Sequence, residues 1–208
     1  MTSPTWKERG RRLAGPLVEA LAATRLTPDA ISYMGLALSL AAALSVVANQ
    51  LLLALILLLF AGLLDVVDGE LARRRAQASA GGAFLDSNLD RLSEAAVYTA
   101  LIVLWLESAP HWWIGLALAA LIGSLMVSYA RARAEALGFD ATGGWGQRPE
   151  RLIIFYLALA SGAAGYADIM AILIGVIAIL AAGTFLTRFS LVRYQARQRG
   201  ADEITLQP

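Results

Sequence analysis

The sequence contains few of the residues that support thiol or histidine chemistry. Its 208 residues include no cysteine and a single histidine, His111. Disulfides, thiolate metal sites, cysteine nucleophiles and multi-histidine metal sites are therefore excluded. Charge is also scarce, because charged residues make up 16% of the chain against about 25% in a typical soluble domain. Hydrophobic residues make up 58%, and the mean hydropathy is +0.62. This composition excludes a water-soluble globule and a disordered chain, and it is typical of a membrane protein.

Long apolar runs predict the membrane spans. A bilayer core of about 30 Å requires roughly 20 mostly apolar residues in a helix. Three runs, at 30–48, 112–130 and 169–187, are uncharged, and a fourth at 152–167 is shorter. Two more apolar runs adjoin groups of acidic residues. We therefore expect an all-α integral membrane protein, one domain over 1–208, with six transmembrane helices within residues 29–195: 30–48, 51–75, 83–106, 112–137, 151–167 and 169–195.

The basic residues predict the orientation. With six spans, all 17 Lys and Arg residues fall on the same side of the membrane, so both termini are expected in the cytoplasm of a multi-pass protein of the cell membrane. Residues 5–24 mix basic and apolar residues without the continuous apolar core of a signal peptide. They favour an amphipathic helix on the cytoplasmic membrane surface over an ordinary solvated helix. Residues 200–208 are expected to form a polar tail, and no nucleic-acid partner is expected.

Four aspartates lie at the cytoplasmic ends of two successive predicted helices. Asp65 and Asp68 are three residues apart, and Asp86 and Asp90 are four apart, so each pair shares a helix face. A short loop folds the helices back antiparallel and brings the four carboxylates together. Charges in a membrane helix are costly unless they are paired, bound to metal or in water, so these residues are functional candidates. A group of carboxylates suits the hard divalent cations Mg²⁺ and Mn²⁺.

Small residues and an arginine accompany the aspartates. Gly69, Ala72 and Gly82 leave room for a flat group beside the metals, and Arg73 offers a cation for phosphate oxygens. Each feature also has an ordinary explanation. Small residues allow close helix packing, basic residues at a helix end anchor it, and membrane aspartates serve as transporter ion sites or structural ion pairs.

The complete spacing distinguishes these explanations. It runs Asp65-x2-Asp68-Gly69-x2-Ala72-Arg73-x8-Gly82-x3-Asp86-x3-Asp90. All eight positions match the signature of the CDP-alcohol phosphotransferase family of membrane enzymes, which this chain resembles over nearly its whole length. The resemblance implies six helices, a homodimer and transfer of a phosphatidyl group from CDP-diacylglycerol (CDP-DAG) to an acceptor hydroxyl, with CMP leaving.

The resemblance also implies roles for individual residues. Asp65, Asp68 and Asp86 would bind one Mg²⁺, and Asp65, Asp86 and Asp90 a second, with Mn²⁺ as a substitute. Asp90 would also be the catalytic general base. The CDP moiety would contact Pro28, Asp29, Ala30, Ile31, Ser32, Gly69, Ala72, Arg73 and Ser79. The segment 28–32 has a second explanation, because Thr27 or Asp29 could cap a helix with Pro28 in its first turn.

Later arginines bear on the acceptor. Arg188 follows an uncharged run within the last span, where it needs an anionic partner. Converging arginines favour an acceptor that carries a phosphate, and disfavour serine, choline and free inositol. Residues 128–135 and 148–154 resemble stretches of the actinobacterial phosphatidylinositol phosphate synthases, although Arg131 stands where those enzymes usually have lysine. That resemblance implies a binding site for the phosphate of inositol 1-phosphate at Arg131, Arg133, Arg151 and Arg188.

Three other functions remain open at this point. Glycerol 3-phosphate as the acceptor would make the protein a phosphatidylglycerol phosphate synthase. An ion-coupled transporter could use the aspartates as a cation site, although such transporters commonly show internal repeats and midplane sites, and this chain shows neither. A non-catalytic membrane scaffold would not need all four aspartates.

Overall fold

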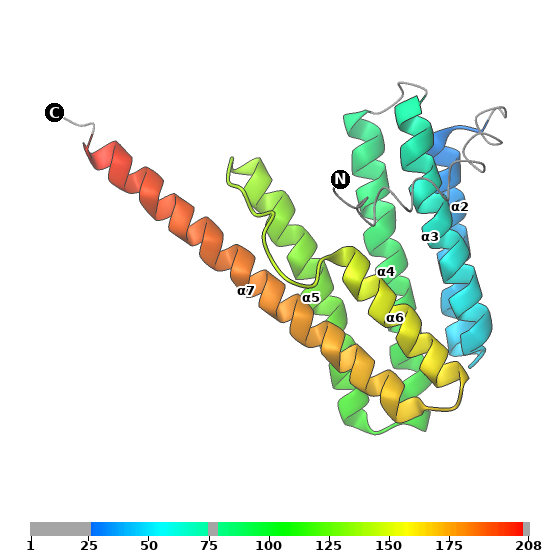
Figure 1. Ribbon diagram of the computed structural model, residues 1–208. Helices are drawn as coiled ribbons and strands as arrows, with labels where there is room; N and C mark the ends of the chain where they lie inside the picture. Colours follow the sequence, from blue (N-terminus) through cyan, green and yellow to red (C-terminus); the bar gives the residue numbers. More distant parts are fainter. Residues whose placement is uncertain (1–25, 75–78, 206–208) are drawn as a thin grey trace, which may run out of the picture. The chain divides into compact units, whose positions relative to one another are not determined.

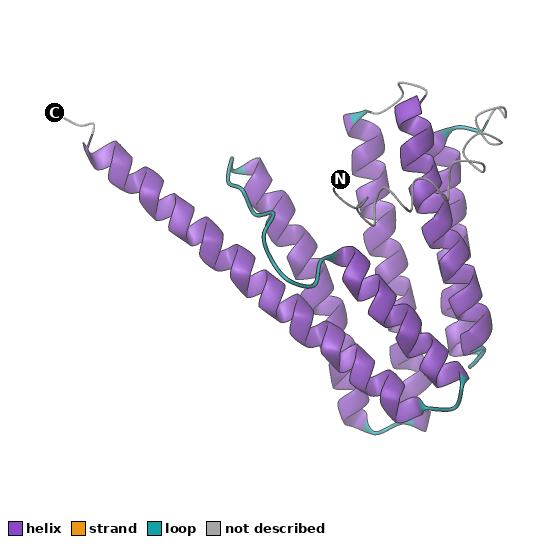
Figure 2. Ribbon diagram, in the orientation of Figure 1, coloured by secondary structure: helices purple, strands orange, loops and turns teal. Residues whose placement is uncertain are grey.

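The computed structural model describes residues 26–74 and 79–205, with the main chain alone for 201–205. This part of the chain is helical, without strands (Figures 1 and 2). Its helices are α2 (Pro28–Val47), α3 (Leu51–Arg74), α4 (Ala80–Ser108), α5 (His111–Ala136), α6 (Arg148–Ala163) and α7 (Ala167–Thr205). They correspond one to one with the six predicted spans. The predicted surface helix at 5–24 lies outside the described residues.

Four of these helices are long and apolar enough to cross a membrane: α2, α3, α5 and the Ala167–Gly200 part of α7. Helix α6 has only 16 residues, and α4 carries four charged residues between Asp86 and Glu94. Large apolar side chains such as Leu44 and Ile179 are exposed on the spanning helices, as expected of surfaces that face lipid. The prediction of an all-helical membrane protein is confirmed, whereas the number of six spans stays a prediction.

Helix starts follow local capping. Thr27 precedes α2, and its hydroxyl accepts a hydrogen bond from the Ala30 N–H, so the capping explanation for this segment holds. Ser79 caps α4 in the same way, at 3.0 Å from the Gly82 nitrogen. The Glu150 carboxylate accepts a bond from the Gln147 N–H, and this capping box starts α6 three residues before the predicted position.

Three helices end in the same left-handed turn. Asn49, Gly138 and Gly165 follow α2, α5 and α6, each with a positive φ. After α6, the Tyr166 and Gly165 N–H groups donate to Ser161 and Gly162, which is the Schellman pattern. This turn ends α6 at Ala163 rather than at the predicted residue 167. Helix α7, in contrast, continues to Thr205 and includes the first residues of the predicted polar tail.

The chain divides into two compact units, with the boundary inside α4 between Leu104 and Trp105. In the first unit, α2 packs against α3, as Figure 1 shows. A buried apolar cluster of Ile31, Val67 and Leu71 joins the two helices, with Leu64 packed against it. This cluster lies next to Ser32 and Asp68 in the sequence and so fixes where those two side chains meet.

In the second unit, α5 and α6 both pack against α7. Small residues allow the close approach of α5 and α7: a Cβ added at Gly123 would lie 2.9 Å from the Cβ of Ala181. Trp105 and Trp113 make an edge-to-face contact at 5.3 Å beside the turn between α4 and α5. The segment between α5 and α6, drawn as a loop in Figure 2, runs alongside α7 and is hydrogen-bonded to it.

Candidate active site

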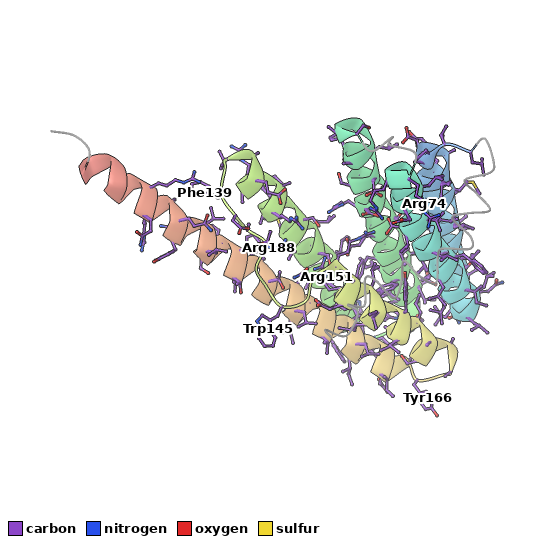
Figure 3. All side chains as sticks on the ribbon, turned by 45° about the horizontal axis from the view of Figure 1, so that its top comes forward. Arg74, Phe139, Trp145, Arg151, Tyr166 and Arg188 are labelled. Atoms are coloured by element: carbon purple, nitrogen blue, oxygen red, sulfur yellow. The ribbon has the colours of Figure 1, made fainter. Side chains whose placement is uncertain are left out.

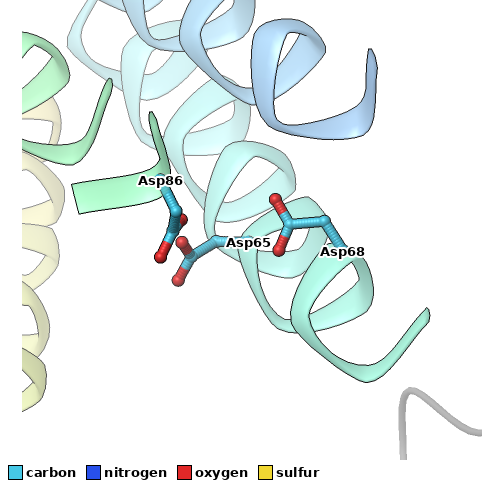
Figure 4. A group of neighbouring side chains, drawn as sticks. All are labelled: Asp65, Asp68 and Asp86. Atoms are coloured by element: carbon cyan, nitrogen blue, oxygen red, sulfur yellow. The ribbon is translucent and has the colours of Figure 1, made fainter. Parts of the chain in front are cut away.

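Three of the four predicted carboxylates meet in the first unit. Asp65 and Asp68 come from α3 and Asp86 from α4, and each offers an oxygen within 4.8 Å of the others (Figure 4). The predicted proximity of the carboxylates is therefore confirmed for three of the four. Asp68 is buried, and the other two carboxylates are half-buried.

Ser32 of α2 orients one of these carboxylates. Its hydroxyl donates to Asp68 Oδ2 at 2.6 Å, a short bond of the kind made to charged oxygens. The neighbouring contact of Ile31 with Val67 holds the two helices in this register. Ser32 was predicted to line the nucleotide; the structure shows it as a partner of a predicted metal ligand.

Asp90 lies one helical turn beyond Asp86 on α4. It is paired with Arg91, whose Nη1 lies 3.5 Å from Asp90 Oδ2 and 2.6 Å from the Ser87 carbonyl oxygen. Among the described residues, the cluster with mutually close oxygens contains Asp65, Asp68 and Asp86. The roles of Asp90 as metal ligand and general base stay predictions.

The donor set of this cluster suits a divalent metal ion. Three carboxylates at close range, with one of them buried, present hard oxygen ligands of the kind that Mg²⁺ and Mn²⁺ prefer. Without a cation these charges would repel one another. The residues therefore fit the metal that the signature implies.

Two of the predicted nucleotide-binding residues on α3 lie against each other. Arg73 folds back over Gly69, where an added Cβ would lie 3.6 Å from Arg73 Nη1. Its guanidinium bonds Glu70 Oε2 through Nη2 at 2.9 Å and remains half-exposed. Ala72 is half-buried in the same turn. Arg73 is thus an accessible cation near the carboxylates, held by a surface ion pair that costs little to break.

The remaining predicted nucleotide-binding residues lie at the starts of α2 and α4. Asp29 of α2 comes within 4.0 Å of a Cβ added at Gly82 of α4, so the two helix starts are close together. Pro28 and Ala30 are half-buried, and Ser79 is exposed. The side chain of Ile31 is a core contact, 1% exposed.

The predicted acceptor arginines lie in the second unit, and two of them are buried. Arg151 of α6 and Arg188 of α7 are 2% and 5% exposed, and Figure 3 shows them in the same region. Arg151 Nη1 donates to the Gly146 carbonyl at 2.7 Å. Arg188 donates through Nε to the Gly143 carbonyl at 3.1 Å and through Nη1 to the Val127 carbonyl at 2.8 Å. Main-chain oxygens thus fix both guanidinium groups.

Arg131 belongs to the same group of charges. It pairs with Glu135 one turn later on α5 at 2.8 Å, and both side chains are half-exposed. Arg131, Arg151 and Glu135 all interact electrostatically with Arg188. Arg133 is exposed on α5. Nearby in the connecting segment, hydrogen bonds from the Thr142 hydroxyl and N–H lower the pKa of Asp140, which is therefore an anion at neutral pH.

Comparison with known proteins identifies the family. The model of the CDP-alcohol phosphatidyltransferase family matches residues 25–186 and therefore includes all four signature aspartates and all of the predicted arginines except Arg188. The chain belongs to the CDP-alcohol phosphatidyltransferase family. It is an enzyme of phospholipid biosynthesis that transfers a phosphatidyl group from a CDP-linked lipid to an alcohol, and the transporter and scaffold alternatives are set aside.

Named members of the family are similar over most of the chain. The archaetidylinositol phosphate synthase of Methanothermobacter thermautotrophicus is 38% identical over 75% of this chain and 74% of its own length. The phosphatidylinositol phosphate synthase of Mycobacterium tuberculosis is 35% identical over 69% and 67%. The crystal structure of the M. tuberculosis enzyme with CDP-DAG bound matches with a TM-score of 0.80 at 30% identity, covering 87% of this chain and 94% of that one. The same enzyme in complex with manganese and citrate matches equally well, at 29% identity.

Two features of this family member were not predicted from its sequence. The bond between Ser32 and Asp68 joins residues 36 positions apart, and its only sequence signal is the position of Ser32 beside an apolar core residue. The carbonyl partners of Arg151 and Arg188 carry no residue-type signal at all, because every residue has a carbonyl. In the sequence, the close approach of residues 138–146 to a helix is indicated only by the glycines at 138, 143, 144 and 146.

Proposed function

We propose that the enzyme transfers the phosphatidyl group of CDP-DAG to the hydroxyl of a phosphorylated polyol, inositol 1-phosphate, giving phosphatidylinositol phosphate and CMP. The observation that carries this is the burial of two arginines, Arg151 and Arg188, which interact electrostatically. Like charges buried together are unfavourable unless an anion joins them. The names of the relatives support the same acceptor class, since they are inositol phosphate lipid synthases.

The acceptor phosphate would be bound by Arg131, Arg133, Arg151 and Arg188. Arg151 and Arg188 would supply preorganised forks, because main-chain carbonyls already fix their planes. Arg131 would exchange its exposed partner Glu135 for phosphate. Planar guanidinium groups suit a phosphate through paired, charge-assisted bonds. Serine, choline and free inositol lack the anion that would occupy such a site.

The donor would be held by the first unit. Asp65, Asp68, Asp86 and Asp90 would hold two Mg²⁺ ions, which Mn²⁺ could replace; when bound, these ions neutralise the pyrophosphate and stabilise the departing CMP. Ser32 keeps Asp68 in position. Gly69 and Gly82 leave space beside the carboxylates, and Arg73 would move from Glu70 to a phosphate oxygen. The starts of α2 and α4, with Asp29 and Ser79, would line the nucleotide.

The chemical step needs one proton acceptor. The acceptor hydroxyl oxygen attacks the phosphorus on the lipid side of the pyrophosphate, and the bond from that phosphorus to the CMP oxygen breaks. Asp90 would take the hydroxyl proton, and its half-buried position in α4, one turn beyond Asp86, suits a base that remains reachable. CMP departs with the negative charge.

The membrane arrangement completes the proposal. All six helices would span the bilayer, with both termini and the active site on the cytoplasmic side and with residues 5–24 as a surface helix. The short α6 and the charged α4 would be shielded from lipid by protein, in part by a second copy in a homodimer. The one-sided distribution of all 17 basic residues supports this orientation.

The acceptor is tested by a substrate panel. Purified enzyme in detergent receives CDP-DAG and Mg²⁺ with inositol 1-phosphate, glycerol 3-phosphate or serine, and CMP release is measured. We expect CMP release with inositol 1-phosphate to be at least about tenfold faster than with the other two acceptors. Only inositol 1-phosphate both carries a phosphate for the arginine site and matches the acceptor class in the names of the relatives. CMP release with glycerol 3-phosphate alone would support the same reaction but identify the enzyme as a phosphatidylglycerol phosphate synthase. Release with serine would contradict the phosphate site.

A further inference from the structure

The segment between α5 and α6 lies along one face of α7. We call residues 138–146 the strap. The α7 residues that meet it are spaced three or four apart and so share a face; they are Leu180, Thr184, Arg188, Leu191, Gln195 and Arg199. The strap runs opposite to α7, because Gly146 meets Leu180 and Gly138 meets Arg199.

The strap is short between its attachments to α7. Its backbone turns at Gly144 and Gly146, which have positive φ values. Only three Cα–Cα steps, about 10–11 Å when extended, separate Asp140 from Gly143. Attachment of Asp140 to α7 therefore limits where Gly143 can lie.

Two side chains attach the strap near the C-terminal end of α7. The Gln195 amide pairs twice with Asp140: Oε1 accepts from the Asp140 N–H at 3.1 Å, and Nε2 donates to its carbonyl at 2.7 Å. Arg199 donates to the Gly138 carbonyl and stacks on the Phe139 ring at 4.3 Å. These contacts use the main chain of the strap.

At its other end the strap holds the buried arginines. Gly143 presents its carbonyl to Arg188 Nε, and Gly146 presents its carbonyl to Arg151 Nη1. The Thr184 hydroxyl donates to the Trp145 carbonyl between them. A displaced strap would therefore release two guanidinium groups from the planes in which they are fixed.

We propose that Gln195 and Arg199 are positioning residues of the acceptor site, which act through the strap on Arg188 and Arg151. The inference rests on the proposed function of these arginines in binding the acceptor phosphate. Gln195 and Arg199 bond to the main chain of the strap, and both lie beyond residue 186, where the family match ends. They thus give the C-terminal extension of α7 a role in acceptor affinity.

The test separates the two substrates kinetically. The full-length enzyme carrying Gln195→Ala and Arg199→Ala together is assayed by CMP release, with each substrate varied in turn. We expect the KM for inositol 1-phosphate to rise at least about fivefold, as for the loss of one net hydrogen bond or more, with kcat and the KM for CDP-DAG within about twofold. When Gln195→Ala is combined with Arg199→Lys instead, a cation remains over Phe139. We expect this variant to recover part of the affinity for inositol 1-phosphate.

Matched controls lie on the same helix. Gln198→Ala and Arg197→Ala remove the same residue types from exposed positions, where Gln198 donates to the Tyr194 hydroxyl. We expect wild-type kinetics from both. An unchanged acceptor KM in the double variant, or equal losses for both substrates, would overturn the positioning role. A wild-type enzyme that releases no CMP with any phosphorylated acceptor would instead overturn the proposed function, so the wild-type assay distinguishes the two failures.

Discussion

Ser32 shows how a single side chain outside the acidic signature contributes to the metal site. Its bond to Asp68 comes from a third helix, α2, and it orients a carboxylate that is 6% exposed. Groups that hydrogen-bond to metal ligands commonly change metal affinity or activity by about 10–100-fold. The site is therefore built by α2, α3 and α4 together, although the signature lies on α3 and α4 alone.

We expect Ser32→Ala to raise the Mg²⁺ concentration for half-maximal activity by about tenfold, because Asp68 loses the donor that fixes its oxygen. The measurement is a Mg²⁺ titration of CMP release. Ser39→Ala is the control, since Ser39 is buried on the same helix and donates to the Gly35 carbonyl within it. Equal Mg²⁺ dependence of the two variants would contradict the role of Ser32.

The signature residues were predictable because their spacing is local. The i, i+3 and i, i+4 pairs of aspartates define helix faces without knowledge of the fold, and a short loop brings the two faces together. Ser32 illustrates the limit of such reasoning. Its partner lies across a helix packing contact, and only the register set by Ile31 and Val67 shows which residue of α2 meets Asp68.

At the scale of elements, the helices themselves followed from apolar runs, whereas their ends depended on capping. The predicted sixth span ends at residue 195, yet α7 continues to Thr205. About 58 Å of helix results, which exceeds the roughly 30 Å hydrocarbon core. Within this added stretch, Arg199 has partners in the strap, at Gly138 and Phe139, that composition does not reveal.

The close approach of the strap to α7 depends on glycine. Gly144 has a φ of +124°, and a Cβ there would lie 2.6 Å from Thr184 Cγ2. We expect Gly144→Ala to destabilise the protein by about 1–3 kcal/mol from backbone strain alone, with further loss from the contact. Thermal unfolding in detergent measures this as a lower Tm.

Gly183→Ala is the matched control, one residue from Thr184. A Cβ at Gly183 meets nothing within 4 Å, and alanine favours a helix interior. Its Tm should equal or exceed that of the wild type. If Gly144→Ala unfolded at the same temperature as this control, the strap would not lie against Thr184 as described.

At the scale of the whole molecule, the proposed topology assigns each loop to one side of the membrane. The absence of cysteine makes this directly testable, because any introduced cysteine is the only thiol. Gln198→Cys reports the C-terminal end of α7, and His111→Cys reports the exposed start of α5. In intact cells, a membrane-impermeant maleimide should label only His111→Cys. Labelling of Gln198→Cys before permeabilisation would contradict cytoplasmic termini.

The central claim is that a phosphorylated polyol accepts the phosphatidyl group and keeps its own phosphate. The most direct measurement is the mass of the lipid formed from CDP-DAG, Mg²⁺ and inositol 1-phosphate. We predict a product that retains both the phosphodiester and the inositol phosphate, formed together with CMP and abolished by EDTA. A lipid without the second phosphate, or a lipid product that forms only from glycerol 3-phosphate, would contradict it.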